Sequence, residues 1–179
     1  MSTALRAVIG DKLVDQEMKA VDFEDRIQSM GLIAIYFSAH WCPPCRGFTP
    51  QLKKAHQKWK ADGQNIEVIF ASSDQDEAAM ASYLREDHGN WLAFPFGDSK
   101  INELSTKYSV RGIPTLVVLD ADGKTIDASA RATVTKKGDE AIIQWMGART
   151  EGEPEAKEGP SEPNDGNTQE SWFARCTLL

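Results

Sequence analysis

The chain has 179 residues, 41% of them apolar, and carries a formal net charge of −7 at pH 7. This apolar content is enough for one domain with a buried core. The acidic balance argues against nucleic-acid binding, and no apolar stretch is long enough to cross a bilayer. The N-terminus also lacks the basic-then-apolar pattern of a secretory signal, so we expect a protein of the reducing cytoplasm.

Strand-like and helical patterns alternate along the chain, which predicts an α/β fold. Helical patterns occupy residues 23–30, 77–84, 103–108 and 139–146. Residues 32–37 form a short apolar run, which predicts a buried strand. A second strand-like run covers residues 115–119 and ends in turn-forming residues.

The most informative motif is Trp41-Cys42-Pro43-Pro44-Cys45, which stands between the first predicted strand and a helical pattern. The apolar residues that follow are spaced as on one face of a helix, and Pro44 suits the first turn of that helix. Cys42 therefore falls at the helix N-terminus, where backbone N–H groups stabilise a thiolate. Cys45 lies inside the first turn and should be more buried than an exposed Cys42.

Two cysteines in this arrangement point to thiol–disulfide exchange. Cys42 would attack a substrate disulfide, and Cys45 would resolve the mixed disulfide that results. A structural disulfide is one alternative, but its loop is minimal and would add little stability. A zinc site is another; it needs about four ligands, and the chain has three cysteines and no second Cys-x-x-Cys.

Four segments, in this order, resemble tryparedoxins and nucleoredoxins, a branch of the thioredoxin superfamily. They are residues 38–50 around the dithiol, 68–74, 91–96 and 110–116. The resemblance covers residues 13–146 and implies a thioredoxin-like α/β fold, with a central mixed β-sheet flanked by helices. It also implies a cis peptide bond between Ile113 and Pro114.

The same resemblance implies a protein-disulfide reductase that binds no cofactor or metal. Electrons would come from a dithiol donor, namely trypanothione, glutathione or a flavin-containing enzyme of the thioredoxin-reductase type, and clients would include peroxiredoxins. The backbone of Ile113, beside Pro114, would pair with an extended substrate as a strand adds to a sheet edge. Trp41 and Pro43 would line the contact surface. Arg131 would hold a substrate carboxylate, with a solvated arginine as the alternative.

Residues near the dithiol are candidates for supporting roles. Tyr36 stands where thioredoxins carry a buried aspartate that relays protons, so it would either orient a water or serve as a core aromatic. His40 and Arg46 would favour the thiolate as cations, or lie exposed without a role. Asp74 and Asp76 follow a strand end and are predicted to cap the next helix.

The composition changes after residue 147. Residues 148–170 hold seven acidic and two basic side chains and many Pro and Gly, which predicts an acidic disordered linker after a domain of residues 1–147. Residues 171–179 are apolar again and end in a Cys-Thr-Leu-Leu sequence that fits prenylation of Cys176. A membrane tether through this tail and an ordinary terminal thiol both stay open.

Two other functions fit the same residues. A redox-sensitive adaptor would use the dithiol only to switch partner binding, and the long tail with its apolar end keeps this alternative open. A thiol peroxidase on the same fold would reduce hydroperoxides through a sulfenic acid on Cys42. The Cys-x-x-Cys spacing favours disulfide exchange instead, and we expect a monomer.

Overall fold

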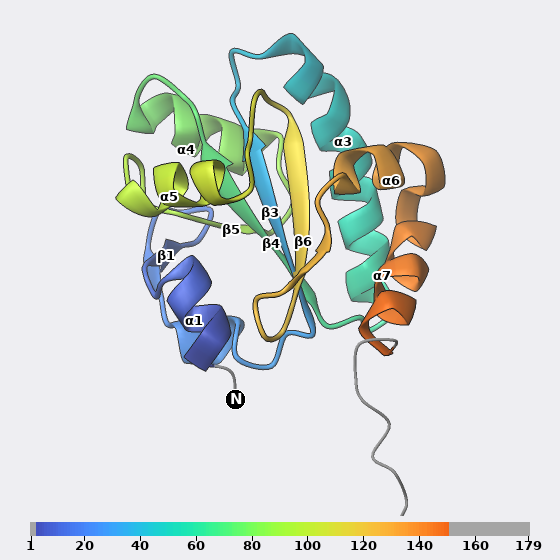
Figure 1. The fold of residues 1–179 in the computed structure, drawn as a ribbon. Helices are drawn as coiled ribbons and strands as arrows, with labels where there is room; N and C mark the ends of the chain where they lie inside the picture. The colour runs from blue at the N-terminus through green and yellow to red at the C-terminus, as the bar shows by residue number, and fades with distance from the viewer. Residues whose placement is uncertain (1–2, 151–179) are drawn as a thin grey trace, which may run out of the picture.

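The computed structural model describes residues 3–150 of the chain. Its strands, in chain order, are β1 (Leu13–Val14), β2 (Ala20–Val21), β3 (Leu32–Ser38), β4 (Ile66–Ser72), β5 (Leu92–Ala93), β6 (Thr115–Asp120) and β7 (Thr125–Asp127). They form one sheet in the order β2-β1-β5-β4-β3-β6-β7 (Figure 1). The sheet is mixed, because β4 runs parallel to β3 and β5 whereas the other neighbours pair antiparallel.

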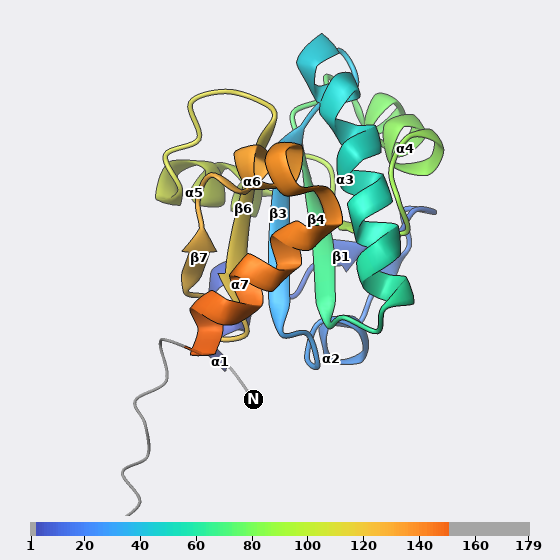
Figure 2. The same ribbon diagram turned by 90° about the vertical axis from the view of Figure 1, so that its right-hand side faces the viewer.

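Helices cover both faces of this sheet. They are α1 (Thr3–Ile9), α2 (Phe23–Arg26), α3 (Pro43–Ala61), α4 (Glu77–Glu86), α5 (Ser99–Lys107), α6 (Ala130–Lys137) and α7 (Ala141–Thr150), with a 3-10 turn, η1 (Gly138–Glu140), before α7. Figure 2 shows α3, α6 and α7 in front of the central strands. A central mixed sheet flanked by helices is the predicted architecture.

β3 and β4 lie at the centre of the sheet because most of their side chains are apolar on both faces. All seven residues of each strand are buried, as in parallel strands that helices cover on both sides. Successive side chains point to opposite faces, so Tyr36 belongs to one core and Ile35 to the other. In the ladder, Ile35 pairs with Ile69 of β4 and Val117 of β6. The strands predicted at residues 32–37 and 115–119 are therefore confirmed as β3 and β6.

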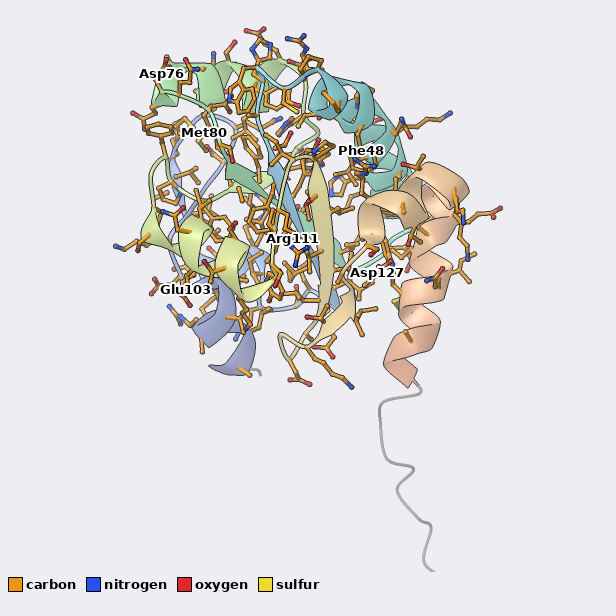
Figure 3. The ribbon with its side chains drawn as sticks, turned by 45° about the horizontal axis from the view of Figure 1, so that its top comes forward. Phe48, Asp76, Met80, Glu103, Arg111 and Asp127 are labelled. Atoms are coloured by element: carbon orange, nitrogen blue, oxygen red, sulfur yellow. The ribbon has the colours of Figure 1, made fainter. Side chains whose placement is uncertain are left out.

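The two faces of the sheet have separate cores. On the Tyr36 face, Phe48 of α3 and Met80 of α4 belong to one apolar cluster, together with residues of α6 and α7 (Figure 3). On the other face, Phe23 of α2 and Ile101 of α5 join residues of α1. The dithiol helix α3 is thus held by the larger of two independent apolar layers.

Several helix ends follow from capping residues. Asp76 accepts a hydrogen bond from the Ala79 N–H at 2.8 Å and caps α4, as predicted. Asp98 caps α5 in the same way, so that helix begins at Ser99 and not at residue 103. α2 ends at Arg26, earlier than the helical pattern predicts, because the chain turns there toward β3.

Some elements are absent from the sequence-based prediction. The strands β1, β2, β5 and β7 have two or three residues each, too few for an alternating pattern to be visible. They form because their backbones meet partners from distant parts of the chain. The helices α1 and α6 were not predicted either.

The last helix departs from the predicted domain boundary. α7 continues through Thr150, past residue 147, because Ala148 and Arg149 are good helix formers. The remainder of the predicted linker, the apolar tail and Cys176 lie outside the described residues. Within residues 3–150, no helix is both long and apolar enough to span a membrane.

Glu67 is a carboxylate buried at the start of β4, at the end of the sheet away from the dithiol. Its oxygens lie 3.3 Å from Arg26 Nη2, 3.9 Å from Lys60 Nζ and 3.1 Å from the Val68 N–H. His56 Nε2 lies 3.7 Å away, beyond a direct hydrogen bond. Burial acts to raise the pKa of Glu67, but its polar and charged neighbours outweigh burial and keep the pKa below its usual range.

Glu67→Gln is therefore expected to remove an acid-dependent part of the stability. Because the pKa of Glu67 is lower in the folded than in the unfolded chain, the ionised group stabilises the fold above the unfolded pKa of about 4.3. That contribution is lost as the pH falls through the folded value. In urea at neutral pH, the free energy of unfolding of Glu67→Gln should be about 1–3 kcal/mol below that of wild type. As the pH falls into the acid range, the free energy of unfolding should decrease less in the variant than in wild type. The exposed Glu77→Gln is the control; equal acid losses in wild type and Glu67→Gln would contradict the assignment.

Candidate active site

The two thiols of the predicted dithiol lie at the start of α3. Cys42 is the N-cap residue, and Pro43 and Pro44 occupy the first turn, so the predicted helix start is confirmed. Both cysteines are free thiols. Cys42 is 5% exposed and Cys45 is 0% exposed. The prediction of an exposed Cys42 is wrong in degree, because Ile113 packs against both cysteines, although Cys45 is the more buried of the two.

A loop that contains Ile113 and Pro114, here called the proline loop, comes from a later part of the chain and packs against the dithiol. The peptide bond between Ile113 and Pro114 is cis, as predicted. Cys42 Sγ donates a weak hydrogen bond to the Ile113 carbonyl oxygen at 3.8 Å, across 71 positions of sequence. A backbone carbonyl from the loop before β6 therefore faces Cys42 Sγ.

Arg131 lies in a cavity beside that loop. The cavity, of about 450 Å³, is lined by residues that include Gly112, Ile113, Pro114, Ser129 and Arg131. Arg131 is exposed and stands near the N-terminus of α6. Because a guanidinium pairs well with carboxylates, this cavity offers a positive group to a ligand that lies along the proline loop.

Trp41 forms an exposed aromatic surface next to Cys42. Trp41 is 54% exposed, and its indole Nε1–H donates to the Ser73 carbonyl oxygen at 2.9 Å. The hydrogen bond holds one edge of the ring while the remainder stays in water. Pro43 is exposed as well. A fixed, exposed aromatic ring of this kind suits contact with a partner surface.

Asp74 holds the turn that carries the dithiol and does not cap a helix, which corrects the prediction. Its carboxylate accepts from the His40 N–H and from the Ser72 hydroxyl, both at 2.8 Å. Arg46 donates to the His40 carbonyl oxygen at 3.2 Å. The side chains of His40 and Arg46 are exposed. The carboxylate of Asp74 is thus occupied by the turn before α3, and Asp76 alone caps α4.

Tyr36 is a buried aromatic residue with a hydrogen-bonded hydroxyl. The hydroxyl lies 2.9 Å from Thr49 Oγ1 and 3.4 Å from the Cys45 carbonyl oxygen. The ring packs edge-on against Phe48 and Trp91. Burial raises its pKa, so the hydroxyl stays protonated at neutral pH. These contacts match the core aromatic, one of the two alternatives predicted for this position.

Three further hydroxyls near Cys45 were missed by the sequence analysis. Thr49 Oγ1 lies 2.6 Å from the Tyr83 hydroxyl, and Ser38 Oγ lies 3.4 Å from the same Tyr83 oxygen. Thr49 is four positions after Cys45 on one helix, which is a visible signal. Tyr83 comes from α4, and no pattern in the sequence places it beside the dithiol.

Residues 31–125 match the family model described as thioredoxin-like. The chain belongs to the thioredoxin-like family. Human nucleoredoxin is 40% identical over 114 residues, which are 63% of this chain and 26% of that protein. Tryparedoxin of Trypanosoma brucei brucei is 40% identical over 117 residues, which are 63% of this chain and 78% of that protein.

Solved structures show the same relationship. Tryparedoxin II, in complex with glutathionylspermidine, has 31% sequence identity and a TM-score of 0.68, and the match covers 77% of this chain and 95% of that chain. The chain spans about a quarter of the length of the animal nucleoredoxins it matches. Its thioredoxin-like domain is thus similar in sequence and in structure to nucleoredoxins and tryparedoxins.

The fold brings the predicted site residues of this thioredoxin-like chain to one end of the sheet. They come from the end of β3, the start of α3, the loop before β6 and the start of α6: Tyr36, His40, Trp41, Cys42, Pro43, Cys45, Arg46, Ile113, Pro114 and Arg131. The cationic roles predicted for His40 and Arg46 stay predictions, because the Arg46 guanidinium donates to the His40 carbonyl oxygen and the His40 ring packs on Tyr83.

Proposed function

We propose that this chain reduces disulfide bonds in proteins, with Cys42 as the nucleophile and Cys45 as the resolving thiol. The observation that carries the proposal is the contact between Cys42 Sγ, at the N-terminus of α3, and the carbonyl oxygen of Ile113. An extended substrate chain that pairs with the backbone of Ile113 would bring its own sulfur next to Cys42.

The reaction consists of two thiol–disulfide exchanges. The Cys42 thiolate attacks one sulfur of the substrate disulfide, and the other sulfur leaves as a thiolate that takes up a proton. Cys45 then loses its proton and attacks Cys42 Sγ, which releases the second substrate sulfur and leaves a Cys42–Cys45 disulfide. Two electrons pass from the dithiol to the substrate, and either one molecule of a dithiol donor or two molecules of a monothiol donor return them.

The surroundings of Cys42 suit the first exchange. Backbone N–H groups at the start of α3 favour negative charge on a sulfur at that place. Trp41 and Pro43 offer exposed apolar surface to the part of the client that flanks the disulfide. Ile113 limits access to Cys42, so a client must present its disulfide on an extended segment.

The size and positive charge of the cavity at Arg131 favour a small thiol as the electron donor. A volume of about 450 Å³ suits a small ligand, and the guanidinium would hold a carboxylate of that donor. A related tryparedoxin has been solved with glutathionylspermidine. Trypanothione and glutathione are the first donors to test, with a thioredoxin-reductase-type enzyme as the alternative and peroxiredoxins as clients.

Catalytic reduction of insulin disulfides tests the proposal. Wild type should complete many turnovers with glutathione or trypanothione as the donor. Arg131→Ala should slow the reaction by about fivefold with these carboxylate-bearing donors and leave it unchanged with dithiothreitol, which carries no carboxylate. Arg111→Ala, an exposed arginine just before the same loop, is the matched control.

The opposite outcome would redirect the search. A wild-type chain that forms and loses the Cys42–Cys45 disulfide reversibly, yet never turns over insulin, would contradict the reductase. A redox-sensitive adaptor, whose partner binding depends on the state of the dithiol, would then take its place.

A further inference from the structure

A second cavity, of about 500 Å³, lies beside the buried carboxylate of Glu67. The end of α2, the last turns of α3 and the start of β4 meet there, at the end of the sheet away from the dithiol (Figure 2). Its lining includes Arg26, Met30, His56, Lys60 and Glu67. His56 comes 14 positions after Cys42 in the chain, which is about 21 Å along a helix. The cavity is therefore separate from the candidate active site.

His56 is a buried histidine with a ring nitrogen that has no partner in the described part of the chain. The residue is 3% exposed, and within residues 3–150 no group lies within hydrogen-bonding distance of Nε2. The Glu67 carboxylate lies 3.7 Å away, and the Trp91 ring packs edge-on against the imidazole. A buried polar atom without a partner costs free energy. Because this nitrogen belongs to the wall of a cavity, it indicates a ligand that supplies the partner.

Arg26 and Lys60 have hydrogen-bond donors that Glu67 does not use. Arg26 Nη2 lies 3.3 Å and Lys60 Nζ 3.9 Å from Glu67 Oε2, whereas a charge-assisted hydrogen bond measures about 2.7–2.9 Å. Lys60 also donates to the Ile66 carbonyl oxygen at 2.9 Å. A guanidinium carries five N–H donors and an ammonium three, so both groups keep donors for a ligand. Two positive charges stand beside one negative charge, which gives the inner wall a net positive charge.

We propose that this cavity binds a small oxyanion, either a carboxylate or a phosphate, between Arg26, Lys60 and His56. The oxygens of one such group can accept from the guanidinium, the ammonium and an imidazole Nε2–H together. A volume of about 500 Å³ suits a ligand of small-molecule size, and the Met30 thioether offers apolar contact to the remainder of that ligand. Binding in this cavity does not require the dithiol, so it stands apart from the proposed function.

A metal ion fits these walls poorly. Within residues 3–150, no group of three or more His, Cys, Asp or Glu side chains could hold one, and the positive charges of Arg26 and Lys60 would repel it. Asp25 lines the cavity as well and repels an anion, but it is exposed, so water and salt screen its charge. Glu67 is buried, and it is therefore the stronger source of repulsion for a bound oxyanion.

A nuclear magnetic resonance titration of the full, isotopically labelled chain tests the site. The probes are inorganic phosphate and benzoate, whose ring can contact Met30, and chloride keeps the ionic strength constant. We expect saturable changes in the signal of the His56 ring nitrogen and in the backbone amides of Gln57 and Asn90, which also line the cavity. Saturation by phosphate alone assigns a phosphate site, by benzoate alone a carboxylate site, and by both an oxyanion site without preference.

A matched pair of lysine variants on α3 measures the specificity of binding. Lys60→Gln removes a positive charge from the cavity and should weaken the binding of the saturating probe by at least about fivefold. Lys54→Gln removes the same charge from an exposed position of the same helix outside the cavity lining, and it should change the affinity by less than about twofold. His56→Phe keeps a ring against Trp91 but has no Nε2, so it should weaken binding about fivefold.

Glu67→Gln gives the most discriminating result, because stability and affinity should change in opposite directions. The variant loses the ion pairs of the buried carboxylate and is less stable than wild type. It should nevertheless bind the oxyanion at least about fivefold more tightly, because a buried negative charge beside the ligand has been removed. A cavity that is only structural, or that binds a cation, does not gain affinity for an anion from this substitution.

Three results would overturn the oxyanion site. They are no saturable change with either probe, equal weakening in Lys60→Gln and Lys54→Gln, and binding in Glu67→Gln that is no tighter than in wild type. A well-dispersed spectrum checks that each variant is folded. The chain with Cys42→Ser and Cys45→Ser should bind the probes as wild type does, so a failure of insulin reduction and a failure of this site are distinguishable.

Discussion

Cys42→Ser is expected to abolish insulin reduction, by at least about three orders of magnitude, because a serine hydroxyl does not exchange with disulfides. Cys45→Ser should stop the cycle one step later, since Cys42 can still attack but no thiol in α3 releases the mixed disulfide. Intact-protein mass spectrometry after incubation with a client disulfide should find the covalent adduct in Cys45→Ser and not in Cys42→Ser.

Cys176 supplies the control for this experiment, because it is the third cysteine of the chain. Cys176→Ser should reduce insulin as wild type does, and in its background the adduct can form only on the dithiol. An adduct on Cys45 of the Cys42→Ser chain would reverse the two roles. The geometry argues against that result, since Cys45 is fully buried whereas Cys42 keeps 5% of its surface exposed.

Trp145→Ala is expected to lower the free energy of unfolding by about 3–5 kcal/mol, more than any other substitution proposed for this chain. Trp145 is a fully buried residue of α7, and its ring stands edge-on to Trp59 of α3 with centroids 5.4 Å apart. Its Nε1–H donates at 2.9 Å to Asp127, on β7 beside α7 (Figure 3), which also accepts from Thr133 at 2.6 Å. Truncation opens a cavity between α3 and α7 and breaks this bond. The midpoint temperature of thermal unfolding should fall by roughly 10 °C.

Two variants separate the parts of that effect. Trp145→Phe keeps most of the ring and loses the N–H, so it should cost about 1–3 kcal/mol. Ile143→Ala, an exposed position on the same helix, should change the unfolding free energy by less than about 0.5 kcal/mol. If Trp145→Ala lost no more than Ile143→Ala, α7 would not be part of the cooperative core.

The sequence predicts the position of the dithiol better than it predicts the short strands around it. The apolar run at 32–37 and the prolines after Cys42 specify a strand followed by a helix start, so both cysteines fall where local rules place them. The cis bond before Pro114 was predicted from the family resemblance and is present. The short edge strands were missed, because pairing of two-residue segments depends on distant backbone and not on local pattern.

Local rules fail where a side chain has competing partners. Asp74 and Asp76 are both suitable helix caps by position, and only the fold shows that Asp74 binds the His40 N–H instead. The exposure of Cys42 is another such case, since Ile113 approaches it from 71 positions away. Local sequence carries no information about that approach.

The sequence by itself determined the dithiol, its place at a helix N-terminus and the greater burial of Cys45, because capping and helical spacing act over a few residues. The tertiary structure alone decided the polar surroundings of Cys45. Ser38 and Thr49 are near in the chain, but Tyr83 reaches them from α4, and a hydroxyl's donor or acceptor role depends on every neighbour it meets. Such roles are set by packing between elements, which no short segment of sequence encodes.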